Sequence, residues 1–189
     1  MVEGINFNSR LQTLVVSARA WSGTVYRSSA VRYANERELL VGTGASLGGG
    51  RWNPKGVEAV YGSMTPETCL AETLSLSRYY GLDASELMPR VFAAITVSLS
   101  SVLDLTAGSV RQKLGVSLKR MLGEDWIKAQ ASGRVPMTQA IGRSAAATGY
   151  EGLIVFSAAE PGGRNLVWFP RNLRASSRIA ICNVDQLRR

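Results

Sequence analysis

Residues 42–81 restrict the possible fold most, because a glycine-rich run leads there into a short apolar stretch and then into a capped helix. Residues 42–50, GTGASLGGG, contain five glycines, which predicts a loop. The following RWNPKG adds a bulky aromatic, an asparagine and a proline, and these residue types favour a fixed turn. Residues 57–63, VEAVYGS, favour a strand. A fixed loop is therefore expected immediately before a strand and a helix.

Residues 65–80 carry the clearest helix signal in the chain. Thr65 is the expected N-cap and Pro66 occupies the first turn. Gly81 is expected to end the helix. Glu72 lies at the shoulder of an apolar arc on this helix, and a half-buried carboxylate there needs a partner. The arc consists of Cys69, Leu70, Leu74, Leu76 and Tyr80.

The remaining segments predict strands and helices in irregular order. Strands are expected over 24–27, 90–100, 151–157, 164–170 and 176–184, and VLDL at 102–105 either extends the second of these or starts another. Short helices are expected over 109–132 and a longer one over 136–149. About six strands and three or four helices without βαβ alternation predict an α+β fold. At 189 residues the chain is expected to form a single domain, 1–189.

Composition sets the expected compartment. No apolar run reaches the ~20 residues that cross a bilayer, and the start MVEGINFNSRLQTL lacks the pattern of a secretory signal. Cys69 and Cys182 are the only cysteines, which fits a reducing compartment and favours neither a disulfide framework nor a metal site. We therefore expect a cytoplasmic protein with no membrane partner and no metal.

Histidine is absent, which excludes Ser–His–Asp and Cys–His catalysis. An enzyme with this composition must use carboxylates, arginines, tyrosines, serines and backbone groups. The net charge of +8 suits a phosphate-bearing ligand, a nucleic acid or an acidic partner, although many soluble proteins are simply basic. The basic residues are scattered without a block, which weakens the nucleic-acid interpretation.

Five side chains are candidates for a site, and each also has an ordinary structural interpretation. Arg51 follows the glycine run. Its guanidinium is either placed to bind a phosphate group or is simply a solvated cation on a loop. Arg27 is a site cation or an edge charge, and Glu72 is a cleft carboxylate or one half of a surface ion pair. Tyr61 ends a strand as a core or site residue, and Ser157 is a site residue or only the first residue of a loop.

The joint order of these residues is more specific than any one of them. The segments VYRSS, GGRWNPKGVEAVYGSMTPETCLAE and LIVFSAAEPGGRNLVWFP, within about residues 21 to 183, resemble the RES domain family, which is named for its Arg, Glu and Ser. On matching positions, the family's functional residues fall on Arg27, Arg51, Tyr61, Glu72 and Ser157. Residues 100–150 carry no motif that can be placed.

The resemblance implies both a fold and an activity. RES domains are similar to ADP-ribosyltransferases, with a split mixed β-sheet core and surrounding helices around an NAD cleft. They act as bacterial toxins that degrade NAD by hydrolysis or phosphorolysis of the nicotinamide–ribose bond. NAD would then be a substrate, no metal would be needed, and a cognate antitoxin would block the cleft.

The same resemblance implies a role for each residue. Glu72 would stabilise the positive charge that develops on the ribose. Arg27 and Arg51 would hold the pyrophosphate. Tyr61 would stack on the nicotinamide or the ribose, and Ser157 would bond the ribose or orient Glu72. Further residues expected to line the pocket are Tyr26, Trp52 and Asn53.

Other functions stay open on the sequence alone. A protein mono-ADP-ribosyltransferase would share the cleft and differ only in the acceptor of ADP-ribose. A basic nucleic-acid-binding module would use aromatics such as Trp52 and Trp168 near arginines. An immunity or regulatory protein could keep the fold without activity, although the presence of the residues named above argues against it.

Overall fold

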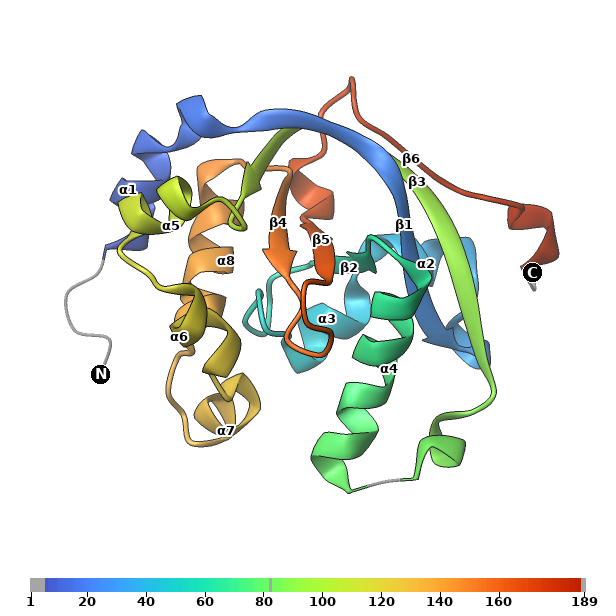
Figure 1. Cartoon of the computed structure of the whole chain (residues 1–189). Coiled ribbons are helices and arrows are strands. Elements are labelled where there is room, and N and C mark those ends of the chain that lie inside the picture. Colours follow the sequence, from blue (N-terminus) through green and yellow to red (C-terminus); the bar gives the residue numbers. More distant parts are fainter. Residues whose placement is uncertain (1–5, 82, 188–189) are drawn as a thin grey trace.

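The computed structural model describes residues 6–81 and 83–187 (Figure 1). Its strands form a six-stranded mixed sheet in the order β1-β2-β5-β4-β3-β6, with an additional pairing of β1 with β3. Among the described strands, β3 and β4 form the only parallel pair. The strands are β1 (Arg19–Ala30), β2 (Val60–Ser63), β3 (Arg90–Asp104), β4 (Gly152–Phe156), β5 (Arg164–Trp168) and β6 (Arg178–Ile181).

The sheet is split into two parts that touch at narrow junctions. Strands β1 and β3 pair over almost their whole length and curve together over the molecule (Figure 1). Strand β1 meets β2 at the single pair Tyr26 and Ser63, and β3 meets β4 only over Val102–Asp104. The parts β1–β3–β6 and β2–β5–β4 therefore diverge, which confirms the expected α+β fold with a split mixed sheet.

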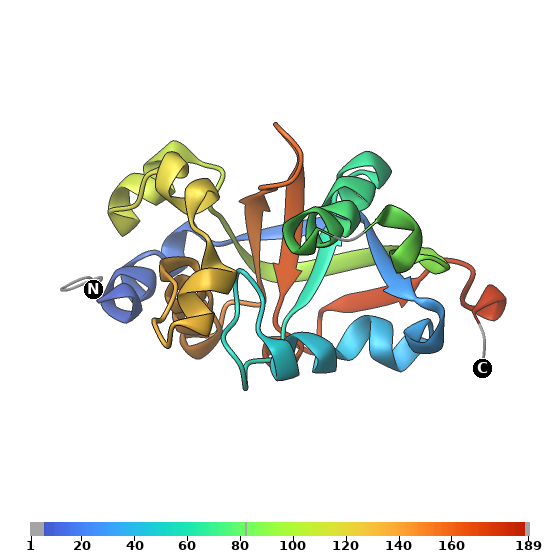
Figure 2. The same cartoon turned by 90° about the horizontal axis from the view of Figure 1, so that it is seen from below.

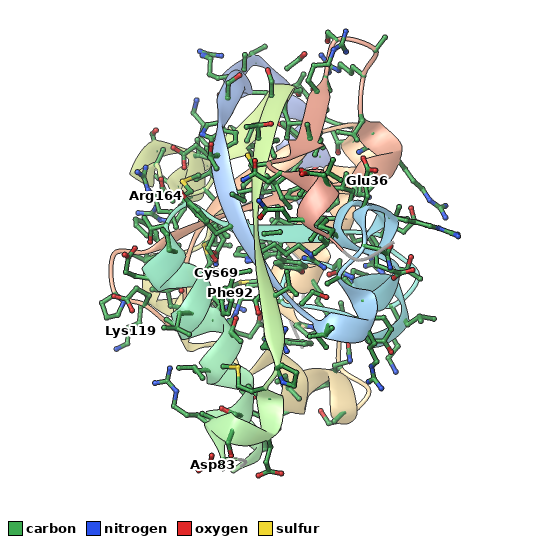
Figure 3. All side chains as sticks on the ribbon, turned by 90° about the vertical axis from the view of Figure 1, so that its right-hand side faces the viewer. Glu36, Cys69, Asp83, Phe92, Lys119 and Arg164 are labelled. Atoms are coloured by element: carbon green, nitrogen blue, oxygen red, sulfur yellow. The ribbon has the colours of Figure 1, made fainter. Side chains whose placement is uncertain are left out.

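Eight α-helices surround the sheet in the described part of the chain. In Figure 1, α1 and α5 to α8 lie on one side of β4 and β5, and α4 lies on the other. Figure 3 shows α4 beside the long β1–β3 ribbon, with Cys69 between them. The helices are α1 (Phe7–Thr13), α2 (Glu36–Val41), α3 (Thr43–Gly48), α4 (Pro66–Tyr80), α5 (Gly108–Leu114), α6 (Leu118–Gly123), α7 (Trp126–Ala131) and α8 (Met137–Thr148).

The glycine-rich segment corrects the sequence-based expectation. Residues 42–50 were expected to be a loop, but Thr43–Gly48 form the short helix α3. Gly42 and Gly49 flank it with φ of +77° and +79°, so these glycines mark helix boundaries. A Cβ on Gly42 would lie 2.6 Å from the carbonyl oxygen of Ala59, so this position also requires close backbone approach. Helices α1 and α2 were likewise not expected.

Helix α4 has the predicted ends, but only part of its predicted apolar arc is buried, and Cys69 is the buried member among the described residues. The Thr65 hydroxyl accepts a hydrogen bond from the Thr68 N–H at 3.1 Å, and Gly81 adopts φ of +66°. Leu70, expected in an apolar arc, is 44% exposed. The side chains of Leu76 and Tyr80, also placed in that arc, lie outside the described residues. The buried positions of the helix are Thr68, Cys69, Thr73 and Ser77.

Small side chains on the buried face let α4 pack closely against β1 and β2. The Thr73 and Ser77 hydroxyls donate to carbonyls of their own helix, at 2.7 Å and 2.9 Å, so their burial leaves no hydroxyl donor unpaired.

Elsewhere the structure is held by two apolar clusters. One fills the space inside the split sheet around Trp168, and the other packs α1, α5, α6 and α8 against β4 and β5. No described helix combines the length and apolarity that crossing a membrane requires.

Glu151, at the start of β4, joins three segments through a fully buried carboxylate. Its oxygens accept hydrogen bonds from the N–H groups of Ser100 (2.7 Å), Ser101 (2.9 Å) and Arg174 (3.1 Å), and from the Ser177 hydroxyl. Burial alone would raise the pKa of Glu151, but these hydrogen bonds hold it below its ordinary value. The carboxylate therefore ties the β5–β6 connection to β3.

We expect Glu151→Gln to lower the free energy of unfolding by about 2 kcal/mol, because buried N–H groups lose a charged acceptor. A group with a depressed folded-state pKa stabilises at neutral pH and loses that effect as the pH falls through the folded-state pKa. The difference in free energy of unfolding between wild type and variant should therefore be largest near neutral pH. It should shrink as the pH falls below the ordinary pKa of a carboxyl group. Urea unfolding at several pH values measures it.

Glu58→Gln is the matched control, because Glu58 forms an exposed ion pair with Arg171 at 3.0 Å. Such surface pairs contribute little, so this variant should unfold nearly as the wild type does. Equal losses for the two variants would contradict the role given to Glu151.

Candidate active site

A cavity of about 550 Å³ opens between α4 and α7, a volume typical of ligand-binding clefts. Figure 2 shows α4 and the α6–α7 segment on opposite sides of β4 and β5. Residues of β1, β2 and β5 line the inner wall. The outer wall includes Trp126 and Ile127 of α7, and Tyr79 of α4 donates to the Asp125 carboxylate at the start of α7 at 3.2 Å.

Strand register explains why the inner wall is polar. Tyr26, Ser63 and Asn165 are direct cross-strand partners on β1, β2 and β5, so their side chains share one face of the sheet. All three line the cavity. Two residues along on the same face, Val167 packs in the core cluster beside α8, while its partner Tyr61 packs against that cluster and also lines the cavity. One face of the sheet thus passes from core to cavity within two residues.

Glu72 projects from α4 into this cavity and is half-buried, as predicted. Its Oε1 accepts two hydrogen bonds, from Ser157 Oγ and from Asn165 Nδ2, both at 2.7 Å. Within the described part of the chain, no donor reaches Oε2. Two neutral donors therefore fix the carboxylate through one oxygen and leave the other for a ligand.

Ser157 lies behind Glu72 and does not itself line the cavity. Its Oγ accepts the N–H groups of Ala159 and Glu160, both at 3.0 Å. A hydroxyl has two lone pairs and one proton, so with both lone pairs engaged the proton must point to Glu72. Of the two contacts expected for Ser157, the structure therefore makes the one that orients Glu72.

Among the residues that the structure describes, three guanidinium groups face the cavity, together with one carboxylate, that of Glu72. Arg27 Nη1 donates to the Tyr61 carbonyl at 3.0 Å, next to the single residue pair that joins β1 and β2. The buried Nε of Arg27 has no partner among the described residues. Arg51 Nη1 donates to the carbonyls of Met121 and Glu124 at the end of α6, at 3.1 and 3.0 Å. Burial lowers the pKa of both arginines.

Arg90, at the start of β3, is the third guanidinium and was not predicted. Its Nε donates to Ser28 Oγ at 2.6 Å, and burial lowers its pKa as well. Arginine keeps its charge in proteins, so an anionic ligand would offset the desolvation of these groups. The cavity is therefore suited to a ligand that carries phosphate.

Tyr61 secures the RWNP turn against the cavity. Its hydroxyl donates to Asn53 Oδ1 at 2.6 Å and accepts the Trp52 N–H at 2.9 Å, and burial raises its pKa. Asn53 is fully buried, donates to the carbonyls of Ala45 and Val57, and does not line the cavity. Trp52 lines it but is 97% buried in the core. The fixed turn was predicted correctly. The Asn53 side chain holds it through hydrogen bonds, and the Trp52 side chain holds it by packing in the core.

Most of the residues predicted for the site line this cavity, and Ser157 and Asn53 lie behind its wall. Tyr26, Arg27, Arg51, Trp52, Tyr61 and Glu72 all line the cavity. Asn165 and Arg90 were missed, and their only sequence signal was a polar side chain within a predicted strand. Both cysteines are free, and Cys69 is buried in the cavity wall. No group of histidine, cysteine or acidic side chains suited to a metal occurs within residues 6–81 and 83–187.

Comparison with known families identifies the class of protein. The RES domain family matches residues 24–188, so the chain belongs to the RES domain family. Curated relatives are the NAD(+) phosphorylase MbcT of Mycobacterium bovis and of Mycobacterium tuberculosis H37Rv, each 30% identical over 116 residues. The matched region covers 60% of this chain and only 60% of these relatives.

A solved structure shares the fold over nearly the whole chain. It is a chain of the crystal structure of the M. tuberculosis MbcT–MbcA toxin–antitoxin complex, with a TM-score of 0.68 and 24% identity. The match covers 96% of this chain and 98% of that chain, so residues 100–150 belong to the shared fold although they carry no recognisable motif.

We expect Tyr61→Phe to lower the free energy of unfolding by about 1–3 kcal/mol, because the Trp52 N–H and the Asn53 side chain lose their shared partner. Tyr33→Phe is the control, since Tyr33 is exposed and its ring contact with Arg32 survives the change. Urea unfolding of both variants measures the difference. Indistinguishable stabilities would show that the hydroxyl does not hold the turn.

Proposed function

We propose that this chain degrades NAD by breaking the bond between nicotinamide and ribose, as the toxin of a toxin–antitoxin pair. The observation that carries the proposal is Glu72, held by Ser157 and Asn165 in a cavity lined by three arginines. Membership of the RES domain family supports it, as do the names of the relatives, NAD(+) phosphorylases and a toxin–antitoxin complex.

The chemistry needs a negative group beside the ribose. When the C1′–N bond breaks, its electron pair leaves with nicotinamide and cancels the charge of the pyridinium ring, while positive charge builds up on the ribose. A group that stabilises this developing charge more than the ground state lowers the barrier. Glu72 Oε2 supplies this stabilisation, and the fixed carboxylate costs little reorganisation.

The arginines position the dinucleotide. Arg27 and Arg51 hold the pyrophosphate, which fixes C1′ relative to Glu72. Tyr26 and the ring of Tyr61 contact the nicotinamide or the ribose. Ser157 acts as a positioning residue for Glu72, and the remaining predicted site residues, Trp52 and Asn53, position the turn that carries Arg51.

Phosphate is the acceptor that we propose, in keeping with the names of the relatives. Arg27 and Arg51 already match the two negative charges of the pyrophosphate, and Arg90 supplies a third guanidinium that suits a second anion. The phosphate oxygen forms the new bond to C1′, giving nicotinamide and the 1″-phosphate of ADP-ribose. Transfer to water or to a protein would give free or protein-bound ADP-ribose instead, so product analysis separates the three acceptors.

The partner and compartment follow from this proposal. An enzyme that consumes NAD without control would be harmful to its own cell, so a cognate antitoxin that covers the cavity is the expected partner. Both would act in the cytoplasm, where NAD is available. Nucleic acid is not needed, and no described contact favours it.

We expect Glu72→Gln to fold normally and to lower NAD turnover at least ~100-fold, because it removes the charge while keeping the size of the side chain. Glu67→Gln, an exposed change one turn earlier on α4, should retain full turnover. NAD loss and product formation by the purified proteins, with phosphate present and absent, measure both. Near-normal turnover in Glu72→Gln would rule out the assigned role.

We expect Arg51→Lys to raise the apparent KM for NAD by at least ~10-fold, because an ammonium does not reproduce the guanidinium fork. Arg78→Lys, at the exposed end of α4, is the matched control and should leave KM unchanged. Steady-state kinetics at saturating phosphate give the values. An unchanged KM in Arg51→Lys would exclude a pyrophosphate contact.

A further inference from the structure

Asn165 is a polar residue of the inner wall whose backbone position is fixed by the sheet. It lies on β5, which pairs on both sides, with Ser63 of β2 and Val155 of β4. Its side chain is almost wholly buried and lines the cavity. Its Nδ2 donates to Glu72 Oε1 at 2.7 Å, while its buried Oδ1 accepts no hydrogen bond from the described residues.

The orientation of this amide follows from its neighbour. Glu72 Oε1 is a carboxylate oxygen and can only accept, so the amide must present its NH₂ group to it. The carbonyl oxygen Oδ1 is then turned away from Glu72 with no donor. Buried acceptors are almost always paired, so an unpaired acceptor on a residue that lines a cavity points to a donor group on the ligand.

We propose that Asn165 has two roles in the reaction. It positions Glu72, and it accepts a hydrogen bond from a hydroxyl group of the nicotinamide-bearing ribose. This inference rests on the proposed NAD cleavage and identifies the part of the substrate that the inner wall recognises. Nδ2 keeps the carboxylate aimed at the sugar, and Oδ1 accepts the hydroxyl proton in a hydrogen bond without any proton transfer.

The position of Glu72 selects the ribose among the donors of NAD. The other donors are the carboxamide, the adenine amino group and the second ribose. Nδ2 and Oδ1 belong to one amide group, so Oδ1 lies close to the Glu72 carboxylate. In the proposed reaction that carboxylate faces C1′ of the ribose, so the nearest donors are the hydroxyls of the same sugar. Because β5 is central in its part of the sheet, the contact is preorganised before substrate binds.

The first test is the pH dependence of Asn165→Asp. At neutral pH the introduced carboxylate cannot donate to Glu72 and repels it, so kcat should fall at least ~100-fold. Two carboxyl groups this close share one proton, and the protonated pair restores the lost hydrogen bond. The relative activity of the variant should therefore rise as the pH falls from 8 towards 5. Asn8→Asp, an exposed change in α1, should follow the wild-type profile.

The second test asks what Oδ1 binds, using Asn165→Leu and NAD analogues that lack the 2′- or the 3′-hydroxyl of the nicotinamide ribose. In the wild type, one analogue should lose about 10- to 100-fold in kcat/KM. In Asn165→Leu, the same comparison should show a much smaller loss, because the partner is already absent. This double cycle remains informative even if the variant is weakly active or less stable.

Each outcome separates the inference from the proposed function. A wild-type chain that consumes no NAD would overturn the proposed function and the ligand assigned to Asn165 with it. An active wild type with Asn165→Asp lowered equally at every pH would overturn the positioning role alone. If each analogue lowered kcat/KM by the same factor in Asn165→Leu as in the wild type, the ribose contact alone would be overturned.

Discussion

The hydrogen bonds of Glu72 with Ser157 and Asn165 couple the parts of the site. A partly buried carboxylate is costly unless hydrogen bonds replace its water. Ser157 directly follows β4 and Asn165 lies on β5. The turn between these strands is closed by the Ser157 N–H, which donates to the Gly163 carbonyl at 2.8 Å. These hydrogen bonds tie helix α4 to the β4–β5 turn, so the geometry of the site depends on how the split sheet closes.

The opposite wall of the cavity depends on the part of the chain without motifs. Arg51 bonds two carbonyls at the end of α6, and Tyr79 reaches Asp125 at the start of α7. Glu124, between these helices, accepts the N–H groups of Met137 and Thr138 at the start of α8. Residues 118–131 are thus held to the RWNP turn, to α4 and to α8. The contacts of Arg51, Asp125 and Glu124 thus give this wall its position.

Sequence patterns predicted the elements whose signals are local. The ends of α4 followed from Thr65 and Gly81, because capping depends on neighbouring residues. Glu72 and Ser157 followed from the family resemblance. Asn165 did not, because its partner lies 93 residues away and only the closed sheet brings them together. The apolar arc of α4 was predicted correctly at Cys69 and wrongly at Leu70, which is exposed, because what a helix buries depends on the surface that it meets.

The charges in the cavity are kept apart. Each arginine bonds a neutral acceptor: Arg27 a carbonyl, Arg51 two carbonyls and Arg90 a hydroxyl. Glu72 accepts from two neutral donors, and within the described residues it forms no ion pair. A direct Glu–Arg pair would cancel the charges that a dinucleotide with an anionic pyrophosphate and a cationic sugar must meet. In the proposed cleavage of NAD, nicotinamide leaves as a neutral ring and needs no proton, so the absence of histidine does not hinder that reaction. Because the charged side chains are anchored by neutral groups, a few of them would suffice for the proposed reaction.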